Sequence, residues 1–294
     1  MKVRVITAII AAAVFIPMLI FSHTWIFPCA MAFAAAVGCF EMISCAGQKK
    51  NLWLVIPVCA VAALAPIGVR YFSQYTPTEW SYLSPYASSF GDYLSLGVCV
   101  AAVVAIYVFG VAVFANKTLP ITDAAMIIAG CIYIISAFVA IVYLRDYILH
   151  GNFIYLLIFF VAWMTDSFAY FTGRLFGKHK LIPSVSPKKT VEGAIGGVVF
   201  GVITAVSFGF IIDNFFDPDG VITANYLVLA ISGMFLSVVS QIGDLIMSAI
   251  KRHYNIKDYG KFFPGHGGIL DRFDSIIAVS LVMAVICTYF NFFA

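Results

Sequence analysis

Charged residues are scarce in this chain of 294 amino acids. Lysine and arginine together number 17 and aspartate and glutamate 14, so charged side chains make up 11% of the sequence, whereas hydrophobic ones make up 63%. The mean hydropathy is +1.01. A water-soluble fold cannot hide apolar runs of the length that this composition produces. The composition therefore excludes a soluble globular domain and predicts an integral membrane protein.

The chain also lacks the cysteine and glycine signatures of common cofactor sites. Its seven cysteines include no Cys-x-x-Cys pair, which favours apolar packing over a metal or disulfide framework. Residues 173–178 have the wrong spacing for the GxxxxGK[ST] phosphate loop, and residues 193–197 do not match GxGxxG. The familiar nucleotide-binding loops of soluble enzymes are therefore not indicated.

Apolar runs long enough to cross a bilayer, about 18 residues or more, recur along the whole chain. They lie near residues 4–22, 25–45, 52–69, 93–115, 121–144, 153–173, 194–212, 225–248 and 271–293. Because lipid offers no hydrogen bonds to the backbone, each run should be α-helical, and no period-two alternation indicates a strand. We predict an all-α polytopic bundle of about nine transmembrane helices in one domain, residues 1–294. Residues 1–150 would be scaffold helices and residues 151–294 the half that carries the chemistry.

Basic residues favour one side of this predicted bundle. With the N-terminus placed in the cytoplasm, the cytoplasmic side would receive most of them: Lys2, Arg4, Lys49, Lys50, Lys117 and the basic loops 174–189 and 251–261. The opposite side would receive only Arg70 and Arg145, together with the acidic loop 213–219. The positive-inside rule thus predicts a cytoplasmic N-terminus and an external C-terminus. The first run resembles a signal peptide, but its length and the span that follows at once favour a retained helix.

Acidic residues gather at one depth of the second half. Asp166 lies inside the sixth span, Asp244 near the cytoplasmic end of the eighth, and Asp271 and Asp274 at the start of the ninth. A carboxylate in a span is costly and indicates a function by default. Clustered carboxylates repel one another unless a cation lies between them, and oxygen ligands suit Mg²⁺. We favour a divalent-metal site; the alternative, which can hold alongside it, is salt bridges to Arg174, Lys251 or Arg272.

Two acids in the first half have a simpler interpretation. Glu41 and Asp123 lie near cytoplasmic ends of their spans, where helix capping or solvation at the interface explains them. The loop 70–92 is rich in tyrosine and tryptophan. An aromatic belt on the outer face explains this loop better than a substrate lid does.

The loop after the sixth span combines cations, hydroxyls and glycine. Its last part reads Ser-Pro-Lys-Lys-Thr-Val-Glu-Gly, residues 186–193. It stands just before a predicted helix, whose N-terminus attracts anions, so the segment indicates phosphate binding. Gly193 suits either a close approach to a ligand or tight helix packing, and for Gly196 and Gly197 we favour packing.

A second polar segment, residues 248–274, separates the last two spans. It contains Lys251-Arg252, Lys257-Asp258, His266-Gly-Gly and Asp271-Arg-Phe-Asp274. Position by position the segment resembles the signature of the phosphatidate cytidylyltransferase family, the CDP-diacylglycerol synthases. The stretch 166–170 and the loop 173–193 also resemble that family, with Val191 where an aromatic residue is common. The resemblance is strong over residues 150–294, and the first half matches mainly as a set of apolar helices.

The resemblance implies that CTP and phosphatidic acid react to give CDP-diacylglycerol and diphosphate with the help of Mg²⁺. The residues fit this chemistry, because two polyanions must be brought together and their charges neutralised. For His266 a phosphate contact or proton role is favoured over a structural one. We predict the following site residues. The catalytic residues are Asp244, Asp271, Asp274, Lys251, Arg252 and His266, of which Asp244, Asp271 and Asp274 are the metal ligands. The substrate-binding residues are Asp166, Arg174, Ser186, Lys189, Thr190, Glu192, Lys257, Asp258, Gly267, Gly268 and Arg272.

Three other functions are weaker. An ion-coupled transporter would place its acids near the bilayer midplane and repeat half of its sequence, and neither feature is found. A CTP-using polyprenol kinase is disfavoured by the unbroken signature, and an inactive homologue by the presence of every candidate ligand. The predicted partners are CTP, phosphatidic acid of the cytoplasmic leaflet, membrane lipids and a second copy of the chain bound through the first-half helices. No nucleic acid is expected. The predicted location is a plasma membrane, of bacterial type, with the site facing the cytoplasm.

Overall fold

The computed structural model describes residues 2–75, 90–115, 118–216, 222–265 and 267–293. These residues form nine α-helices: α1 (Lys2–Ile20), α2 (Ile26–Cys45), α3 (Leu52–Tyr75), α4 (Phe90–Phe114), α5 (Ile121–Tyr147), α6 (Gly151–Phe176), α7 (Val191–Ile211), α8 (Tyr226–His253) and α9 (Leu270–Tyr289). Each helix corresponds to one predicted span. The all-α fold class is confirmed.

Seven of these helices, α2 to α8, are long and apolar enough to cross a membrane. The first turns of α9, which is not among the seven, contain Asp271, Arg272 and Asp274. In α1 the apolar stretch within the described side chains is the shorter Ile10–Ile20. The protein is thus a multi-pass membrane protein.

One short hairpin was not predicted. Strand β1 (Lys180–Ile182) pairs antiparallel with β2 (Ser186–Thr190), and β2 leads directly into α7. The strands have three and five residues, too few for a period-two pattern to stand out in the sequence. A π-helical turn, η2 (Ile212–Phe216), follows α7 at its other end.

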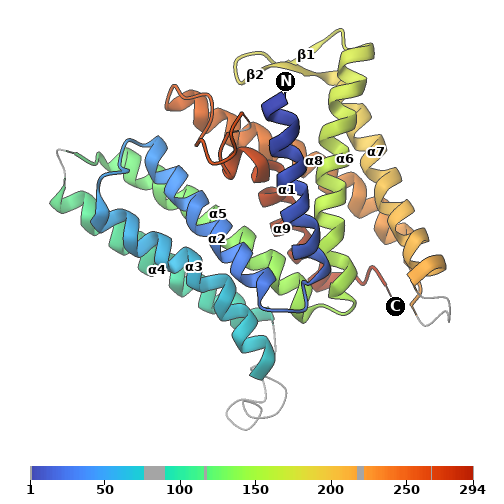
Figure 1. Cartoon of the computed structure of the whole chain (residues 1–294), viewed down its shortest axis with the longest axis horizontal. Helices are drawn as coiled ribbons and strands as arrows, with labels where there is room; N and C mark the ends of the chain where they lie inside the picture. Colours follow the sequence, from blue (N-terminus) through green and yellow to red (C-terminus); the bar gives the residue numbers. More distant parts are fainter. Residues whose placement is uncertain (1, 76–89, 116–117, 217–221, 266, 294) are drawn as a thin grey trace. The chain divides into compact units, whose positions relative to one another are not determined.

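The chain divides into two compact units, and successive stretches of the sequence belong to one unit and then to the other. Unit 1 comprises residues 1–146 and 256–272, and unit 2 comprises residues 147–255 and 273–294. The polar segment before α9 therefore belongs with the first-half helices. In unit 1, α2 packs against α3, and α1 and α4 contact α2 and α3 respectively. Figure 1 shows α3 and α4 side by side in this unit.

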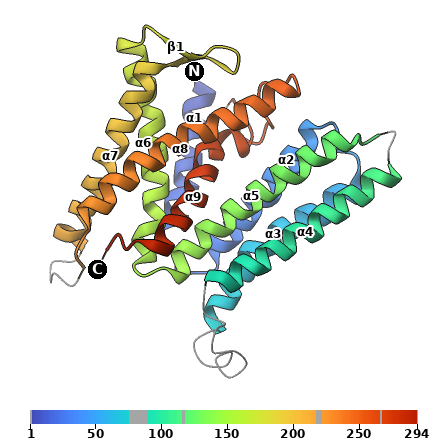
Figure 2. The same cartoon turned by 180° about the vertical axis from the view of Figure 1, so that it is seen from behind.

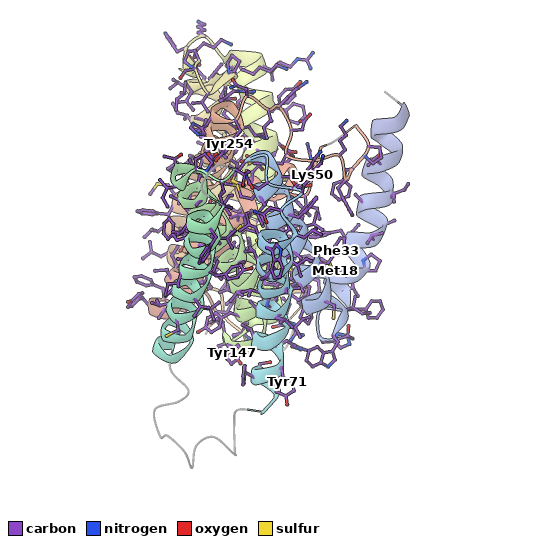
Figure 3. All side chains as sticks on the ribbon, turned by 90° about the vertical axis from the view of Figure 1, so that its left-hand side faces the viewer. Met18, Phe33, Lys50, Tyr71, Tyr147 and Tyr254 are labelled. Carbon is purple, nitrogen blue, oxygen red and sulfur yellow. The ribbon has the colours of Figure 1, made fainter. Side chains whose placement is uncertain are left out.

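The two ends of α3 differ in chemistry. Figure 3 shows Lys50, which precedes this helix, and Tyr71, near its other end, at opposite ends of its length. At the tyrosine end, Arg70 bonds to the carboxylate of Asp146, and Arg145 bonds to the same oxygen at 2.8 Å. The side chain of Asp146 is only 2% exposed. The two arginines that depart from the predicted charge asymmetry are therefore both paired with a buried acid.

In unit 2, α7 packs closely on both α6 and α8 (Figure 2). Glycines make this possible. A Cβ at Gly197 would lie 3.0 Å from the carbonyl oxygen of Thr165 in α6, and one at Gly201 would collide with the hydroxyl of Ser237 in α8. Thr165 also donates to Ser237 at 3.0 Å, in a buried contact that ties α6 to α8. The predicted role of Gly197 in close helix packing is confirmed, as is that of Gly196, which abuts Thr172.

Candidate active site

A pocket of about 350 Å³ opens in unit 2, between α6, α7, α8, the hairpin and the first turns of α9. This volume falls in the usual range for small-molecule sites. The lining residues are Asp166, Ala169, Tyr170, Gly173, Arg174, Leu181, Lys188, Lys189, Thr190, Gly193, Ala194, Gln241, Asp244 and Asp274.

Three carboxylates reach this pocket from three different helices. Asp166 comes from α6, Asp244 from α8 and Asp274 from α9, and all three are partly buried. The neighbouring Gly243 lets α8 approach α9 closely, since a Cβ there would lie 2.9 Å from the carbonyl oxygen of Asp274. Asp274 interacts electrostatically with both other acids and with Lys251. The hydroxyl of Ser275 donates to Asp166 at 2.7 Å and holds that carboxylate in place.

A cation from the hairpin meets the acids. The Lys189 ammonium lies 2.6 Å from Asp244 Oδ2, and the two side chains are 23% and 25% exposed. Lys189 is placed by its neighbour Thr190, the N-cap of α7, whose hydroxyl accepts from the N–H of Gly193 at 3.1 Å. Gly173 and Gly177 of the preceding segment pack against the Thr190 side chain. The sequence Lys-Lys-Thr thus presents its cations at a helix N-terminus, as phosphate binding requires.

Glu192 closes the base of the hairpin. Its carboxylate accepts from the backbone N–H groups of Lys178, at 3.1 Å, and His179, at 3.2 Å, and lies 2.6 Å from His179 Nδ1. At the turn of the hairpin, Arg252 Nε donates to the carbonyl oxygen of Val185 at 3.4 Å. These contacts order the segment that carries Lys189. Figure 1 shows the hairpin beyond the ends of α6 and α7.

Gln241 is a pocket residue that sequence reasoning missed. Its side-chain amide donates to the carbonyl oxygens of Ala194, at 3.2 Å, and Ser237, at 3.3 Å, which fixes its orientation. The signal available in the sequence was a polar residue within a span, three positions before Asp244 and therefore on the same helix face. Lys188, part of the predicted basic loop, also lines the pocket.

In unit 1 a second pair of carboxylates holds the loop before α9. Asp271 Oδ2 accepts from the N–H groups of Tyr259, at 2.8 Å, and Gly268, at 2.9 Å. Glu41 of α2 accepts from the N–H groups of Ile269 and Leu270 and so caps α9, a helix other than its own. Gly267 adopts φ of +92°, a conformation that favours glycine, and pairs with Phe263 in a narrow turn. Capping, the simpler interpretation of Glu41, is thus confirmed.

The predicted site residues fall into three groups. Those that line the unit 2 pocket are Asp166, Arg174, Lys189, Thr190, Asp244 and Asp274. Those in unit 2 but outside that lining are Ser186, Glu192, Lys251 and Arg252. Those in unit 1 are Lys257, Asp258, Gly267, Gly268, Asp271 and Arg272. His266 lies outside the described residues, and so does most of the aromatic loop 70–92. The roles assigned to all of these residues stay predictions.

The pocket contains the kind of ligand atoms that a hard metal cation binds. Three carboxylates line it, and carboxylate oxygens are the ligands that Mg²⁺ prefers. Across the described part of the chain, however, no three His, Cys, Asp or Glu side chains are already gathered as a metal site. One of the three carboxylates, Asp244, is in contact with the ammonium of Lys189. A metal site here therefore stays a prediction that the residue types support.

Acids and cations share one pocket of unit 2, a mixture of charges that suits phosphate chemistry in a membrane protein. A family model described as "Cytidylyltransferase family" matches residues 2–290. The chain belongs to this family, and it is a nucleotidyltransferase. It is 33% identical over 285 residues to a phosphatidate cytidylyltransferase of Staphylococcus haemolyticus, with 95% of this chain and 96% of the relative covered. It is 34% identical over 282 residues to that of Bacillus subtilis, with 95% and 94% covered.

Proposed function

We propose that this enzyme transfers the cytidylyl group of CTP to phosphatidic acid and releases diphosphate. An oxygen of the lipid phosphate attacks the α-phosphorus of CTP and forms a new P–O bond. The bond from the α-phosphorus to the oxygen that bridges to the β-phosphate breaks, and its electron pair leaves with diphosphate. The relatives described above are named after this reaction, and the chain aligns with them over nearly their whole length. CDP-diacylglycerol is thus the product.

The observation that carries the proposal is the mixture of charges in one pocket. The attacking phosphate is already ionised near neutral pH, so no general base is needed. Lys188, Lys189 and Arg174 supply cations at the N-terminus of α7, where phosphate oxygens are also favoured by the helix dipole. They neutralise the two polyanions and orient them for in-line attack.

The acids of the pocket have the complementary role. Asp166, Asp244 and Asp274 would hold Mg²⁺. Asp271, which the sequence also predicted as a ligand, lies in unit 1 and is not part of this pocket lining. When bound, Mg²⁺ would supply positive charge to the phosphates and the leaving diphosphate. Because Lys189 already contacts Asp244, its ammonium would exchange that carboxylate for a phosphate oxygen when the substrates enter. Ser275 keeps Asp166 aimed at the pocket throughout.

The reaction is tested with purified protein, radiolabelled CTP and phosphatidic acid in mixed micelles. The expected product is a labelled liponucleotide that runs with CDP-diacylglycerol and appears with one equivalent of diphosphate. This product forms from CTP labelled in the cytidylyl group; CTP labelled at the γ-phosphorus, with a polyprenol in place of phosphatidic acid, tests the kinase alternative. Label transfer to the polyprenol, or no product at all from folded protein, would contradict the proposal.

The site faces the cytoplasm in this proposal, where CTP is available. The basic residues of the hairpin and of α8 support that side. A cysteine at Lys180 in β1 should react with a membrane-impermeant maleimide only after cells are opened, whereas a cysteine at Asn214, beyond the other end of α7, should react in intact cells. The reverse pattern would place the site outside.

A homodimer through the first-half helices belongs to the same proposal. Side chains on α3 and α4 are strongly exposed in the single chain, with Trp53 at 81%, Ile106 at 73% and Phe114 at 94%. Lipid or a second copy covers such a face in a membrane. Cross-linking of cysteines placed at Ile106 distinguishes the two, because only the dimer yields a covalent pair at low protein-to-lipid ratio.

A further inference from the structure

Glu41 is a buried acid in α2, in the half of the chain expected to be scaffold. Only 4% of the residue is exposed. Its Oε1 accepts from the N–H of Ile269 at 3.0 Å and its Oε2 from the N–H of Leu270 at 2.9 Å. A buried carboxylate is costly unless its oxygens are satisfied, and the first N–H groups of a helix, which have no acceptor within the helix, satisfy them well. The helix start therefore stabilises the buried carboxylate, and the carboxylate in turn satisfies the first N–H groups of α9.

Two glycines of the polar segment fit around this carboxylate. A Cβ at Gly260 or at Gly268 would collide with Glu41 Oε1. Positive φ is found at other glycines of the segment, Gly265 and Gly267, and not at these two. Size, not backbone conformation, is thus the reason that glycine stands at both positions.

The same loop is held at two further points. Asp271 Oδ2 accepts from the N–H groups of Tyr259 and Gly268. The hydroxyl of Thr7, in α1, donates to the carbonyl oxygen of Pro264 at 3.1 Å. Side chains of α1, α2 and α9 therefore fix the backbone between residues 259 and 270. This loop also carries Lys257 and Asp258, which are exposed.

We propose that Glu41 is a positioning residue of the transferase: it fixes the loop 256–269 so that Asp271 and the charged loop residues keep the arrangement that the substrates require. The inference rests on the proposed function for the identity of those substrates. It gives the first-half helices a part in the chemistry, since one of their side chains sets the shape of the segment with the family signature. Without the Glu41 carboxylate, two buried N–H groups lose their acceptors, whereas the bonds from Asp271 and Thr7 to the loop remain.

The first test compares Glu41→Gln with wild type. Glutamine keeps the size of the side chain, but its NH₂ group cannot accept from an N–H donor, so one of the two bonds is lost. We expect kcat/KM for CTP to fall about tenfold or more, as the loss of one charge-assisted hydrogen bond predicts. Trypsin should cut after Lys257 and Lys261 faster, while the melting temperature of the whole protein changes little. Asp123→Asn, in the first turn of α5, is the matched control and should match wild type in all three measurements.

A double-mutant cycle with Gly260→Ala makes the test independent of any one variant. Alone, this substitution forces a methyl group against the Glu41 carboxylate and should lower kcat/KM and speed the tryptic cuts. In a Glu41→Ala background the space is open, so the same substitution should have little further effect. Equal effects of Gly260→Ala in both backgrounds, or wild-type kinetics and proteolysis for Glu41→Gln, would overturn the inference.

The outcomes also separate this inference from the proposed function. If wild-type protein makes no liponucleotide, the proposed reaction is wrong. The rates of tryptic cleavage in the double-mutant cycle still decide whether Glu41 holds the loop. If wild-type protein is active and Glu41→Gln shows faster tryptic cutting with unchanged kinetics, the loop is held by Glu41 but its shape does not matter to the substrates. That result would overturn the positioning role and leave the reaction standing.

Discussion

The ammonium nitrogen of Lys189 lies 2.6 Å from Asp244 Oδ2, which joins the hairpin to α8 across the pocket. Both side chains are about a quarter exposed, with values of 23% and 25%. Ion pairs with this much solvent contact stabilise a fold by about 1 kcal/mol or less. The pair is therefore better suited to arranging charge for phosphates than to holding the fold together.

Replacing Lys189 should accordingly affect catalysis more than stability. We expect Lys189→Ala to lower kcat/KM by about 100-fold or more, the usual loss when one preorganised donor to a developing charge is removed. The melting temperature should change little. Lys180→Ala in β1 is the control, because Lys180 does not line the pocket, and it should retain most activity. A large loss of stability with unaltered kinetics of the folded fraction would show that Lys189 is structural.

Thr190 is expected to matter first as a helix cap. Its hydroxyl accepts from the N–H of Gly193, and Thr190→Ala removes this acceptor. Loss of an N-cap costs about 1 kcal/mol, and Thr190→Ser should restore most of it. Thr204→Ala removes the same atoms from the interior of α7, where the hydroxyl bonds only to the carbonyl oxygen of Phe200, and should be nearly neutral. Thermal unfolding in detergent measures all three variants.

Gly201 should tolerate no side chain. A Cβ there would collide with Ser237 and lie 2.8 Å from the hydroxyl of Thr165, so Gly201→Ala should destabilise the protein by about 1–3 kcal/mol. Gly110→Ala in α4 is the control, since no atom from elsewhere in the described residues lies within 4 Å of the added methyl group, and it should be neutral or slightly stabilising. Equal melting temperatures for the two variants would contradict the packing described for α6, α7 and α8.

Much of the fold could be predicted because the bilayer restricts it. Each of the nine helices matches an apolar run. The ends agree within six residues, from α5, predicted at 121–144 and found at Ile121–Tyr147, to α3, predicted at 52–69 and found at Leu52–Tyr75. Lipid forbids unpaired backbone, so length and hydropathy suffice to place helices. The hairpin was missed because its strands are very short and form outside the apolar runs, where this rule does not apply.

The site was predicted in part, and the reason differs from residue to residue. Four acids, Asp166, Asp244, Asp271 and Asp274, were expected to converge, because ionisable groups in spans face inward. Three of them line one pocket, whereas Asp271 lies in unit 1 and is not in that lining. The sequence could not predict that Asp271 accepts hydrogen bonds from two backbone N–H groups. Nor could it predict that Glu41 accepts hydrogen bonds from the start of α9. Such links depend on how distant segments pack, which spacing in one sequence does not encode. Gln241, by contrast, could have been found from its place in a span three positions before Asp244.

The central claim is tested most directly by the Mg²⁺ dependence of liponucleotide synthesis in wild type, Asp166→Asn, Asp244→Asn and Asp274→Asn. The account predicts Mg²⁺-dependent CDP-diacylglycerol from the wild-type protein, abolished by EDTA and restored by added Mg²⁺. Each asparagine variant should be folded, bind Mg²⁺ more weakly and lose most activity at any Mg²⁺ concentration. Wild-type synthesis that persists in EDTA, or full activity in all three variants, would contradict the claim that these acids act through a metal ion.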